Sequence, residues 1–122
     1  MSKSVLIVED NALVIEMYRS ALRTLDVDVF EARNGQDALT LAAKHQPDLV
    51  LMDILLPGDS GYDVLKQMRA SPGGGHPVVL AVTTAATKAD AAKVASAGFN
   101  GLIPKPINIQ NFIETVRRNL AG

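Results

Sequence analysis

Short apolar runs alternate along this chain with segments whose apolar residues recur every three or four positions. A short apolar run predicts a strand, whereas the spacing of three and four places apolar side chains on one face of a helix. The runs predict strands at residues 5–9, 27–32, 48–53, 78–82 and about 101–104. The helical spacing predicts helices on the face Leu13 to Leu25, at 36–45, 62–70 and about 88–97, and on the face Ile109 to Leu120.

Strict alternation of strands and helices is typical of βα units, whose strands form a parallel sheet. We therefore predict an α/β fold with a five-stranded parallel sheet and helices on both faces. Right-handed crossovers leave few topologies for such a chain, and the flavodoxin-like strand order 2-1-3-4-5 suits five strands. In that order a ligand crevice lies between the carboxyl ends of strands 1 and 3.

Cap and turn residues mark the boundaries between these elements. Asp10 or Asn11 can cap the first helix, and Asn34-Gly35 is a turn pair. The inward face of the first helix is expected to include Leu13 and Met17. Clusters of turn residues predict loops at 57–61 and 71–77.

Acidic residues end the first and third predicted strands. Glu9 and Asp10 follow the first, and Asp53 ends the third. Carboxylates that share a site repel one another, so such a group implies a bound cation or a raised pKa. Mg²⁺ binds through carboxylates, water and phosphate oxygens, and we predict that these three residues hold it, with the backbone carbonyl of Leu55 as a further ligand. The alternative for Glu9 and Asp10 alone is a solvated helix start.

The same set of strand ends favours phosphoryl chemistry. The Asp53 carboxylate can act as a nucleophile that forms an acyl phosphate, although taken alone it can also cap the following loop. Lys105 stands between two prolines that stiffen its backbone, and the Lys105–Pro106 bond is a candidate for the cis form. Thr83 ends the fourth strand and can donate its hydroxyl to a phosphoryl oxygen. The alternatives are a surface lysine for Lys105 and a cap for Thr83.

Composition and charge narrow the class of protein further. The 122 residues fit one domain, 1–122, and their net charge of −1 argues against a dedicated nucleic-acid-binding domain. No stretch approaches the ~20 apolar residues of a membrane span, and cysteine is absent. We expect a cytoplasmic protein with no direct contact to nucleic acid or membrane.

Four motifs in this order resemble the receiver domain of two-component response regulators over the whole chain. They are Val8-Glu9-Asp10-Asn11, Leu49 to Asp53 followed by Pro57 and Gly61, Val82-Thr83, and Lys105-Pro106. Each motif is weak alone, but their combined order and spacing are highly specific. The resemblance implies a CheY-like fold and a stand-alone receiver with no output domain.

The resemblance also implies roles and partners. Asp53 would accept a phosphoryl group from a histidine kinase or a histidine phosphotransfer protein, with Mg²⁺ held by Glu9, Asp10 and Asp53. Thr83 and Lys105 would contact the phosphoryl group and relay its presence. The face formed by the fourth helix, fifth strand and fifth helix would bind a downstream protein, and the chain would be a monomer or weak dimer.

Three positions depart from the pattern of such receivers or are unusual for it. Leu102 stands three residues before the lysine, where receivers usually carry an aromatic that swings inward as a switch. Thr84 stands where a smaller residue is frequent. Leu55, two residues after Asp53, can hinder an attacking water, so we predict a slowly hydrolysing phospho-aspartate.

Two other functions fit parts of the same pattern. A degenerate receiver would bind partners without phosphate, which Leu102 favours and the intact acids, Thr83 and Lys105 disfavour. A Mg²⁺-dependent phosphatase with an aspartyl nucleophile would typically carry a second acid two residues after the nucleophile. Leu55 occupies that position, so we expect a signalling module rather than a turnover enzyme.

Overall fold

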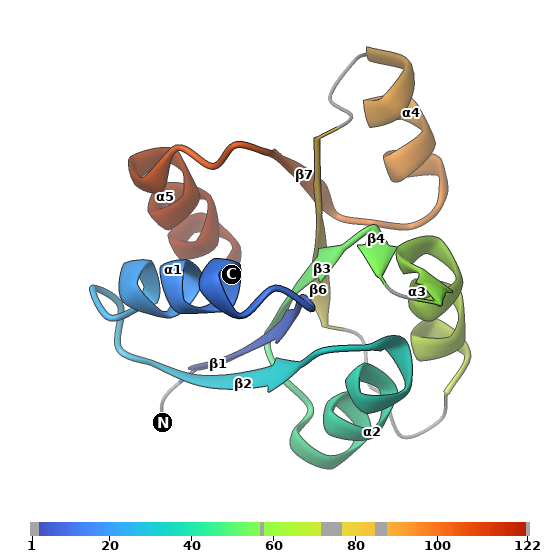
Figure 1. The fold of residues 1–122 in the computed structure, drawn as a ribbon, viewed down its shortest axis with the longest axis horizontal. Coiled ribbons are helices and arrows are strands. Elements are labelled where there is room, and N and C mark those ends of the chain that lie inside the picture. The colour runs from blue at the N-terminus through green and yellow to red at the C-terminus, as the bar shows by residue number, and fades with distance from the viewer. Residues whose placement is uncertain (1–2, 57, 72–76, 85–87, 122) are drawn as a thin grey trace.

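A computed structural model describes residues 3–56, 58–71, 77–84 and 88–121. A five-stranded parallel sheet runs through the centre of the molecule in the order β2-β1-β3-β6-β7 (Figure 1). Its strands are β1 (Lys3–Val8), β2 (Val27–Ala32), β3 (Leu49–Asp53), β6 (Val78–Thr83) and β7 (Gly101–Pro104). Because β6 and β7 are the fourth and fifth strands of this sheet in chain order, the predicted order 2-1-3-4-5 is confirmed.

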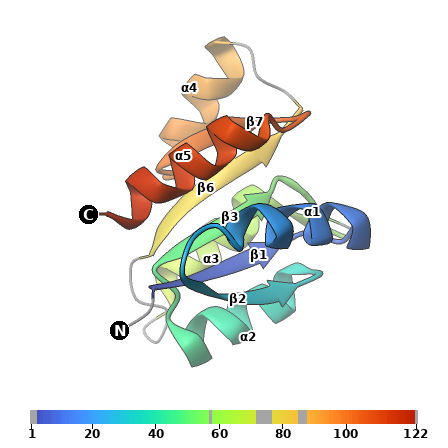
Figure 2. The ribbon, with the colours of Figure 1, turned by 90° about the vertical axis from the view of Figure 1, so that its left-hand side faces the viewer.

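Helices cover both faces of the sheet, as predicted. They are α1 (Ala12–Leu22), α2 (Gly35–His45), α3 (Gly61–Ala70), α4 (Lys88–Ser96) and α5 (Ile109–Leu120). Helices α1 and α5 lie together on one face, and α2 and α3 lie on the other (Figures 1 and 2). Helix α4 stands further out, beyond β6 and β7 (Figure 1).

The alternation of side chains along each strand divides the core into two clusters. Ile7 and Leu51 point to the side of α1 and α5, where they pack with Tyr18 and Phe112. The residues between them in the strands, such as Val8 and Met52, point to the opposite cluster, which contains residues of α2, α3 and α4. Glu9 and Asp53 follow Ile7 and Leu51 by two residues, so their side chains lie on the α1 and α5 side of the sheet.

The helix starts show which cap residues the fold uses. Asn11 caps α1, because its side chain accepts hydrogen bonds from the backbone of Leu13 and Val14. The Asn34-Gly35 pair was expected to be a turn, and this is wrong: Asn34 caps α2 and Gly35 is its first residue. A β-carbon on Gly35 would lie 2.6 Å from Val64 Cγ2, so glycine allows α2 to approach α3 closely.

Two side chains of α1 lie on its exposed side rather than in the core. Leu13 is 82 % exposed and Met17 is 37 % exposed, so their predicted inward placement is wrong. Packing against α5 selects a narrower face of the helix than the apolar spacing suggested. The outer residues instead line an apolar groove between α1 and α5 of about 510 Å³, together with Ile109 and Ile113.

The strand boundaries and the loops differ from the prediction in detail. The first strand covers Lys3–Val8 rather than 5–9, and the third begins at Leu49. Within the expected loop, β4 (Leu55–Leu56) and β5 (Asp59–Ser60) form a short antiparallel pair that the pattern did not predict. Pro57 and most of the predicted loop at 71–77 lie outside the described residues.

Candidate functional site

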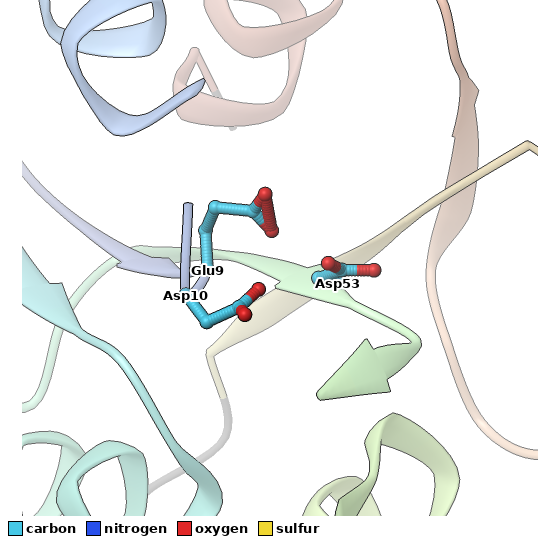
Figure 3. A group of neighbouring side chains, drawn as sticks. All are labelled: Glu9, Asp10 and Asp53. Carbon is cyan, nitrogen blue, oxygen red and sulfur yellow. The ribbon is translucent and has the colours of Figure 1, made fainter. Parts of the chain in front are cut away.

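Three carboxylates meet at the carboxyl edge of the sheet. Glu9 and Asp10 follow β1, and Asp53 is the last residue of the neighbouring strand β3. One oxygen from each of the three carboxylates lies within 4.8 Å of the others, and the side chains point toward one space (Figure 3). The parallel pairing of β1 with β3, in which Val8 is opposite Met52, brings these acids together.

Glu9 is held in an environment that opposes its negative charge. Its residue is 2 % exposed, and its Oε2 atom has no hydrogen-bond partner. Burial, and then interaction with the Asp53 carboxylate, raises the pKa of Glu9 to about 8, although the positive charge of Lys105 lowers it. The buried carboxylates therefore favour the binding of a cation at this site.

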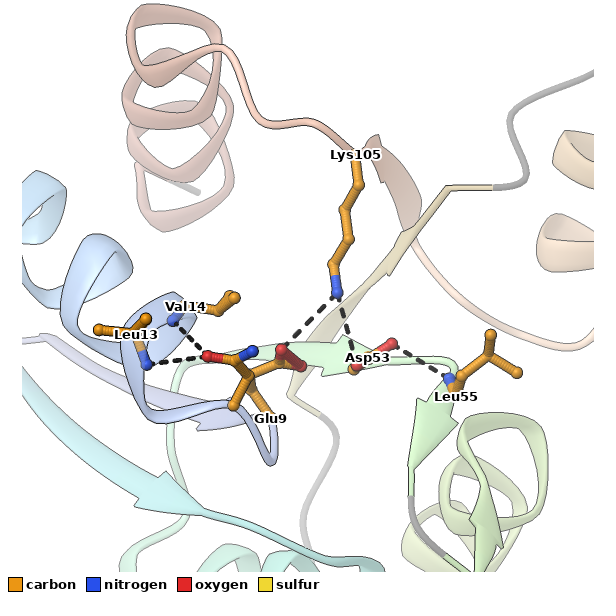
Figure 4. A network of polar contacts seen from close by, with 7 residues as sticks. Glu9, Leu13, Val14, Asp53, Leu55 and Lys105 are labelled. Carbon is orange, nitrogen blue, oxygen red and sulfur yellow. Dashed lines mark hydrogen bonds and ion pairs between the residues drawn. The ribbon is translucent and has the colours of Figure 1, made fainter.

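Lys105 supplies the positive charge that the structure itself places at the site. Its Nζ lies 3.5 Å from Asp53 Oδ2 and 3.7 Å from Glu9 Oε1 (Figure 4). The backbone N–H of Lys105 donates to the carbonyl of Thr83 at 2.9 Å, and the Lys105–Pro106 bond is cis, as predicted. The two short distances from Nζ show that the side chain is directed into the site rather than along the surface.

The backbone around Asp53 fixes the position of its carboxylate. The N–H of Leu55 donates to Asp53 Oδ1 at 3.1 Å (Figure 4). Behind it, a β-carbon on Gly61 would lie 2.8 Å from the Asp53 carbonyl oxygen and from Ile54 Cα, so only glycine allows this close approach. The two carboxylate oxygens thus have different surroundings, one at a backbone N–H and the other facing the Lys105 ammonium.

Thr83 borders two cavities at the end of β6. It is buried, and it lines a crevice of about 320 Å³ together with Glu9, Asp10, Asp53 and Lys105. It also lines a cavity of about 600 Å³ between the β4–β5 pair, α3 and α4, whose walls include Tyr62, Lys93 and Val94. Leu55 and Thr84 line both cavities as well.

Leu102 lies on β7, three residues before Lys105. Its side chain is partly buried and packs against the cluster on the α2, α3 and α4 side of the sheet. This side chain is thus directed away from the acidic crevice, toward the α2, α3 and α4 side of the sheet.

The oxygen donors of the crevice suit a hard divalent cation. The three carboxylate oxygens are close enough to contact one ion, and the unpartnered buried oxygen of Glu9 is a further donor without an internal partner. Carboxylates and waters are the ligands that Mg²⁺ takes in proteins. The residues therefore fit a magnesium ion. Leu55 lies at the same crevice.

The sequence prediction missed part of the wall of this crevice. Asn11 and Val14 line it beside the acids, Thr83 and Lys105, whereas Thr84, which also lines it, was already singled out from the sequence. Asn11 directly follows Glu9 and Asp10 in the sequence, and this adjacency could have indicated that it lines the site. Nothing about Val14 indicates a site, because its spacing matches the core face of a helix. The β4–β5 pair brings Leu55 to the crevice. Its segment was predicted to be a loop, and no pattern in the sequence indicates the two short strands.

Comparison with known proteins gives consistent matches over the whole chain. Residues 5–117 match the family model of the response regulator receiver domain. The polar-differentiation response regulator DivK of Brucella anthropi is 42 % identical over 120 residues, which cover 98 % of this chain and 98 % of that protein.

Solved structures share the fold. A response regulator receiver domain from Methylobacillus flagellatus superposes with a TM-score of 0.85 at 29 % identity, covering 98 % of this chain and 99 % of that one. The receiver domain of a sensor histidine kinase from Pseudomonas aeruginosa superposes with a TM-score of 0.87 at 27 % identity, with full coverage of both chains. That structure has a magnesium ion coordinated in the active site cleft. Among the described residues of the present chain, no helix is long and apolar enough to cross a membrane.

Proposed function

This chain belongs to the response regulator receiver domain family, and from that premise we propose that it is a signalling module switched by phosphorylation of Asp53. The observation that carries the proposal is the environment of the Asp53 carboxylate. One of its oxygens accepts from the Leu55 N–H, and the other lies 3.5 Å from the Lys105 ammonium. The carboxylate is therefore held in one orientation. It lies beside the Lys105 ammonium, whose positive charge would also neutralise a phosphoryl group.

The proposed reaction is the transfer of a phosphoryl group from a phosphohistidine. A carboxylate oxygen of Asp53 attacks phosphorus, the new O–P bond forms, and the N–P bond of the donor breaks. The leaving imidazole keeps the electron pair of that bond and takes up a proton. Such a transfer depends on positioning and on neutralising charge more than on acid–base chemistry.

Each predicted site residue has a place in this proposal. Glu9, Asp10 and Asp53, with the Leu55 backbone carbonyl, would hold Mg²⁺, as the donor set of the crevice supports. When bound, Mg²⁺ supplies positive charge next to the transferred group. The Lys105 ammonium would pair with a phosphoryl oxygen, and the Thr83 hydroxyl would donate to another.

Partners follow from the family and from the extent of the match. Receiver domains interact with histidine kinases or phosphotransfer proteins, and either class would supply the phosphoryl group here. We propose that the chain acts as a stand-alone receiver of residues 1–122, because its match spans 98 % of its DivK relative. We also propose that it is a monomer or a weak dimer. The downstream protein would bind the face formed by α4, β7 and α5.

An intact-mass measurement tests the central proposal. The chain is incubated with Mg²⁺ and acetyl phosphate or a phosphorylated histidine kinase. We expect one phosphoryl adduct that Asp53→Asn abolishes and that Asp63→Asn, at an exposed acid of α3, retains. An unmodified wild-type chain would instead support a phosphate-independent binding module, and continuous phosphate release would support a phosphatase.

Leu55 provides a second test, of the lifetime of the adduct. Its side chain is 76 % exposed and lines the crevice, and we propose that it restricts the approach of water to the phosphoryl group. We expect Leu55→Asn to shorten the half-life of the adduct several-fold, as followed by intact mass after the donor is removed. A wild-type half-life of only seconds, with no shortening in the variant, would contradict the proposed role.

A further inference from the structure

Asp59 of β5 ties the short β4–β5 pair to the start of α2. Its Oδ2 atom accepts a hydrogen bond from the backbone N–H of Gly35 at 3.1 Å. Gly35 is the first residue of α2, where backbone N–H groups have no partner within the helix. The side chain of the cap residue Asn34 accepts from the N–H of Asp37. Asp59 thus completes the cap of α2 from a distant part of the chain.

The sequence leaves room for this contact by placing a glycine at the helix start. A β-carbon on Gly35 would lie 2.8 Å from Asp59 Oδ2 and 2.6 Å from Val64 Cγ2. Any larger residue would therefore push the carboxylate away from the helix. Gly35 is buried and Asp59 is exposed, so the hydrogen bond between them is partly shielded from solvent. Such shielding strengthens a hydrogen bond relative to one in water.

The β4–β5 pair connects Asp59 to the carboxylate of Asp53. Asp59 is paired with Leu56, and Ser60 is paired with Leu55. Leu56 is buried in the same cluster as residues of α2 and α3. The N–H of Leu55 donates to Asp53 Oδ1 at 3.1 Å (Figure 4). The position of the pair relative to α2 therefore affects the group that orients Asp53.

Backbone hydrogen bonds hold the residue directly before the pair. The carbonyl of Ile54 accepts from the Gly61 N–H at 2.8 Å, and the Ile54 N–H donates to the Val82 carbonyl at 3.3 Å. The other strand of the pair has its side-chain anchor in Asp59. Loss of that anchor would leave β4 attached at its start, with a less fixed distance from α2. We therefore expect a displacement of Leu55 rather than unfolding.

We propose that Asp59 is a positioning residue for Asp53: its bond to the start of α2 holds the β4–β5 pair in the place from which Leu55 reaches the Asp53 carboxylate. With the Leu55 N–H at Oδ1, the other oxygen of Asp53 faces Lys105. A carboxylate that loses this fixed orientation attacks phosphorus more slowly. The effect on phosphoryl transfer rests on the proposed function, whereas the effect on the Leu55 N–H does not.

Three variants separate this role from a loss of charge. Asp59→Ala removes the acceptor, and Asp59→Asn keeps an oxygen that can accept from Gly35. Asp63→Ala removes the same charge at an exposed position of α3. We expect Asp59→Ala to slow the formation of the phosphoryl adduct from acetyl phosphate about three- to tenfold, the range of one hydrogen bond. Asp59→Asn and Asp63→Ala should stay within about twofold of the wild type.

Amide proton NMR, without phosphate or metal, tests the link itself. In Asp59→Ala we expect the N–H resonances of Gly35 and Leu55 to move upfield, as amide protons do when a carboxylate acceptor is lost. The N–H resonance of Leu51 in β3 should not move, and Asp63→Ala should leave all three in place.

An unmoved Leu55 resonance in Asp59→Ala would overturn the inference. An Asp59→Asn variant that is phosphorylated as slowly as Asp59→Ala would also overturn it, and so would a displaced Leu51 resonance, which would indicate a general change of structure. A wild type that forms no adduct would count against the proposed function, while the Leu55 resonance would still decide whether Asp59 positions the pair.

Discussion

The two sides of the sheet at its carboxyl edge are built very differently. On the α1 and α5 side, Glu9 and Asp53 are almost fully buried, and Lys105 lies between them. On the other side, Val94 is the buried residue of α4 among those described, and Leu102 of β7 is only partly buried. The acidic crevice is thus held by closely packed strands, whereas α4 contacts the rest of the molecule through few buried side chains.

This difference indicates which part of the molecule is rigid and which part can move. Regions with few buried apolar contacts open locally at low free-energy cost. Groups that act on a phosphoryl group need fixed positions, and the residues proposed for that role stand directly after β1, at the end of β3 and after β7. The face proposed for the downstream partner includes α4, the helix with the fewest buried residues among those described, and this face can therefore respond to small changes at the site.

The largest expected effect is the dependence of the free energy of unfolding on pH, which follows from the raised pKa of Glu9. Because the pKa of Glu9 is raised from 4.5 to about 8 in the folded protein, the folded state holds this proton more tightly than the unfolded state. The resulting stability is fully present below about pH 4.5 and is lost as the pH rises through about 8. The loss is at most about 5 kcal/mol.

Urea unfolding of the metal-free protein at several pH values measures this effect. Glu9→Gln should flatten the profile between pH 5 and 9, and Glu114→Gln, at an exposed acid of α5, should leave it unchanged. Equal slopes for wild type and Glu9→Gln would show that the burial of Glu9 carries no such cost.

The next effect concerns the ammonium group that faces both carboxylates. Lys105→Ala removes the internal positive charge next to Asp53, and we expect phosphorylation by acetyl phosphate to slow about 100-fold. Lys66→Ala, at an exposed lysine of α3, provides the matched control. If both variants reacted within twofold of the wild type, the proposed role of Lys105 would be wrong.

Two glycines compare the packing behind the Asp53 backbone with the packing at the edge strand β7. A β-carbon on Gly61 would meet backbone atoms of Asp53 and Ile54 at 2.8 Å, whereas one on Gly101 of β7 would meet the flexible end of Leu80 at 3.1 Å. We expect Gly61→Ala to lower the free energy of unfolding by about 2 kcal/mol and Gly101→Ala by less. Denaturant unfolding measures both values, and the reverse ranking would contradict the contrast drawn above.

The smallest effect concerns a contact that ties α4 to α3. The Lys93 ammonium lies 4.9 Å from the centre of the Tyr62 ring. Since Lys93 is exposed, we expect Lys93→Met to cost only about 0.5 kcal/mol and to speed amide hydrogen exchange in α4. Exchange in α1 serves as the internal reference, and faster exchange in both helices would indicate a global rather than a local effect.

The sequence was sufficient to predict the order of elements, the sheet topology and the edge at which the polar residues meet. Apolar runs and helical spacing carry that information directly, and parallel strands bring their carboxyl ends together. It was less informative about Leu13 and Met17, because periodicity marks an apolar face but does not say how much of it a neighbouring helix covers. The β4–β5 pair was missed because two-residue strands leave no periodic signal. The contact of Gly61 with the Asp53 backbone forms only when α3 packs against the end of β3, and no pattern in the neighbouring sequence indicates it.

Thr83 belongs to the wall of both the acidic crevice and the larger cavity beside α4. Binding free energies at two such adjoining sites are reciprocal by thermodynamic necessity. A molecule that enters the larger cavity and favours one position of Thr83 must change the affinity of the crevice for its own ligand. The occupied crevice must then change the affinity of the cavity by the same factor. A molecule bound in the larger cavity would therefore change the proposed phosphorylation of Asp53 by the same factor by which that phosphorylation changed its binding.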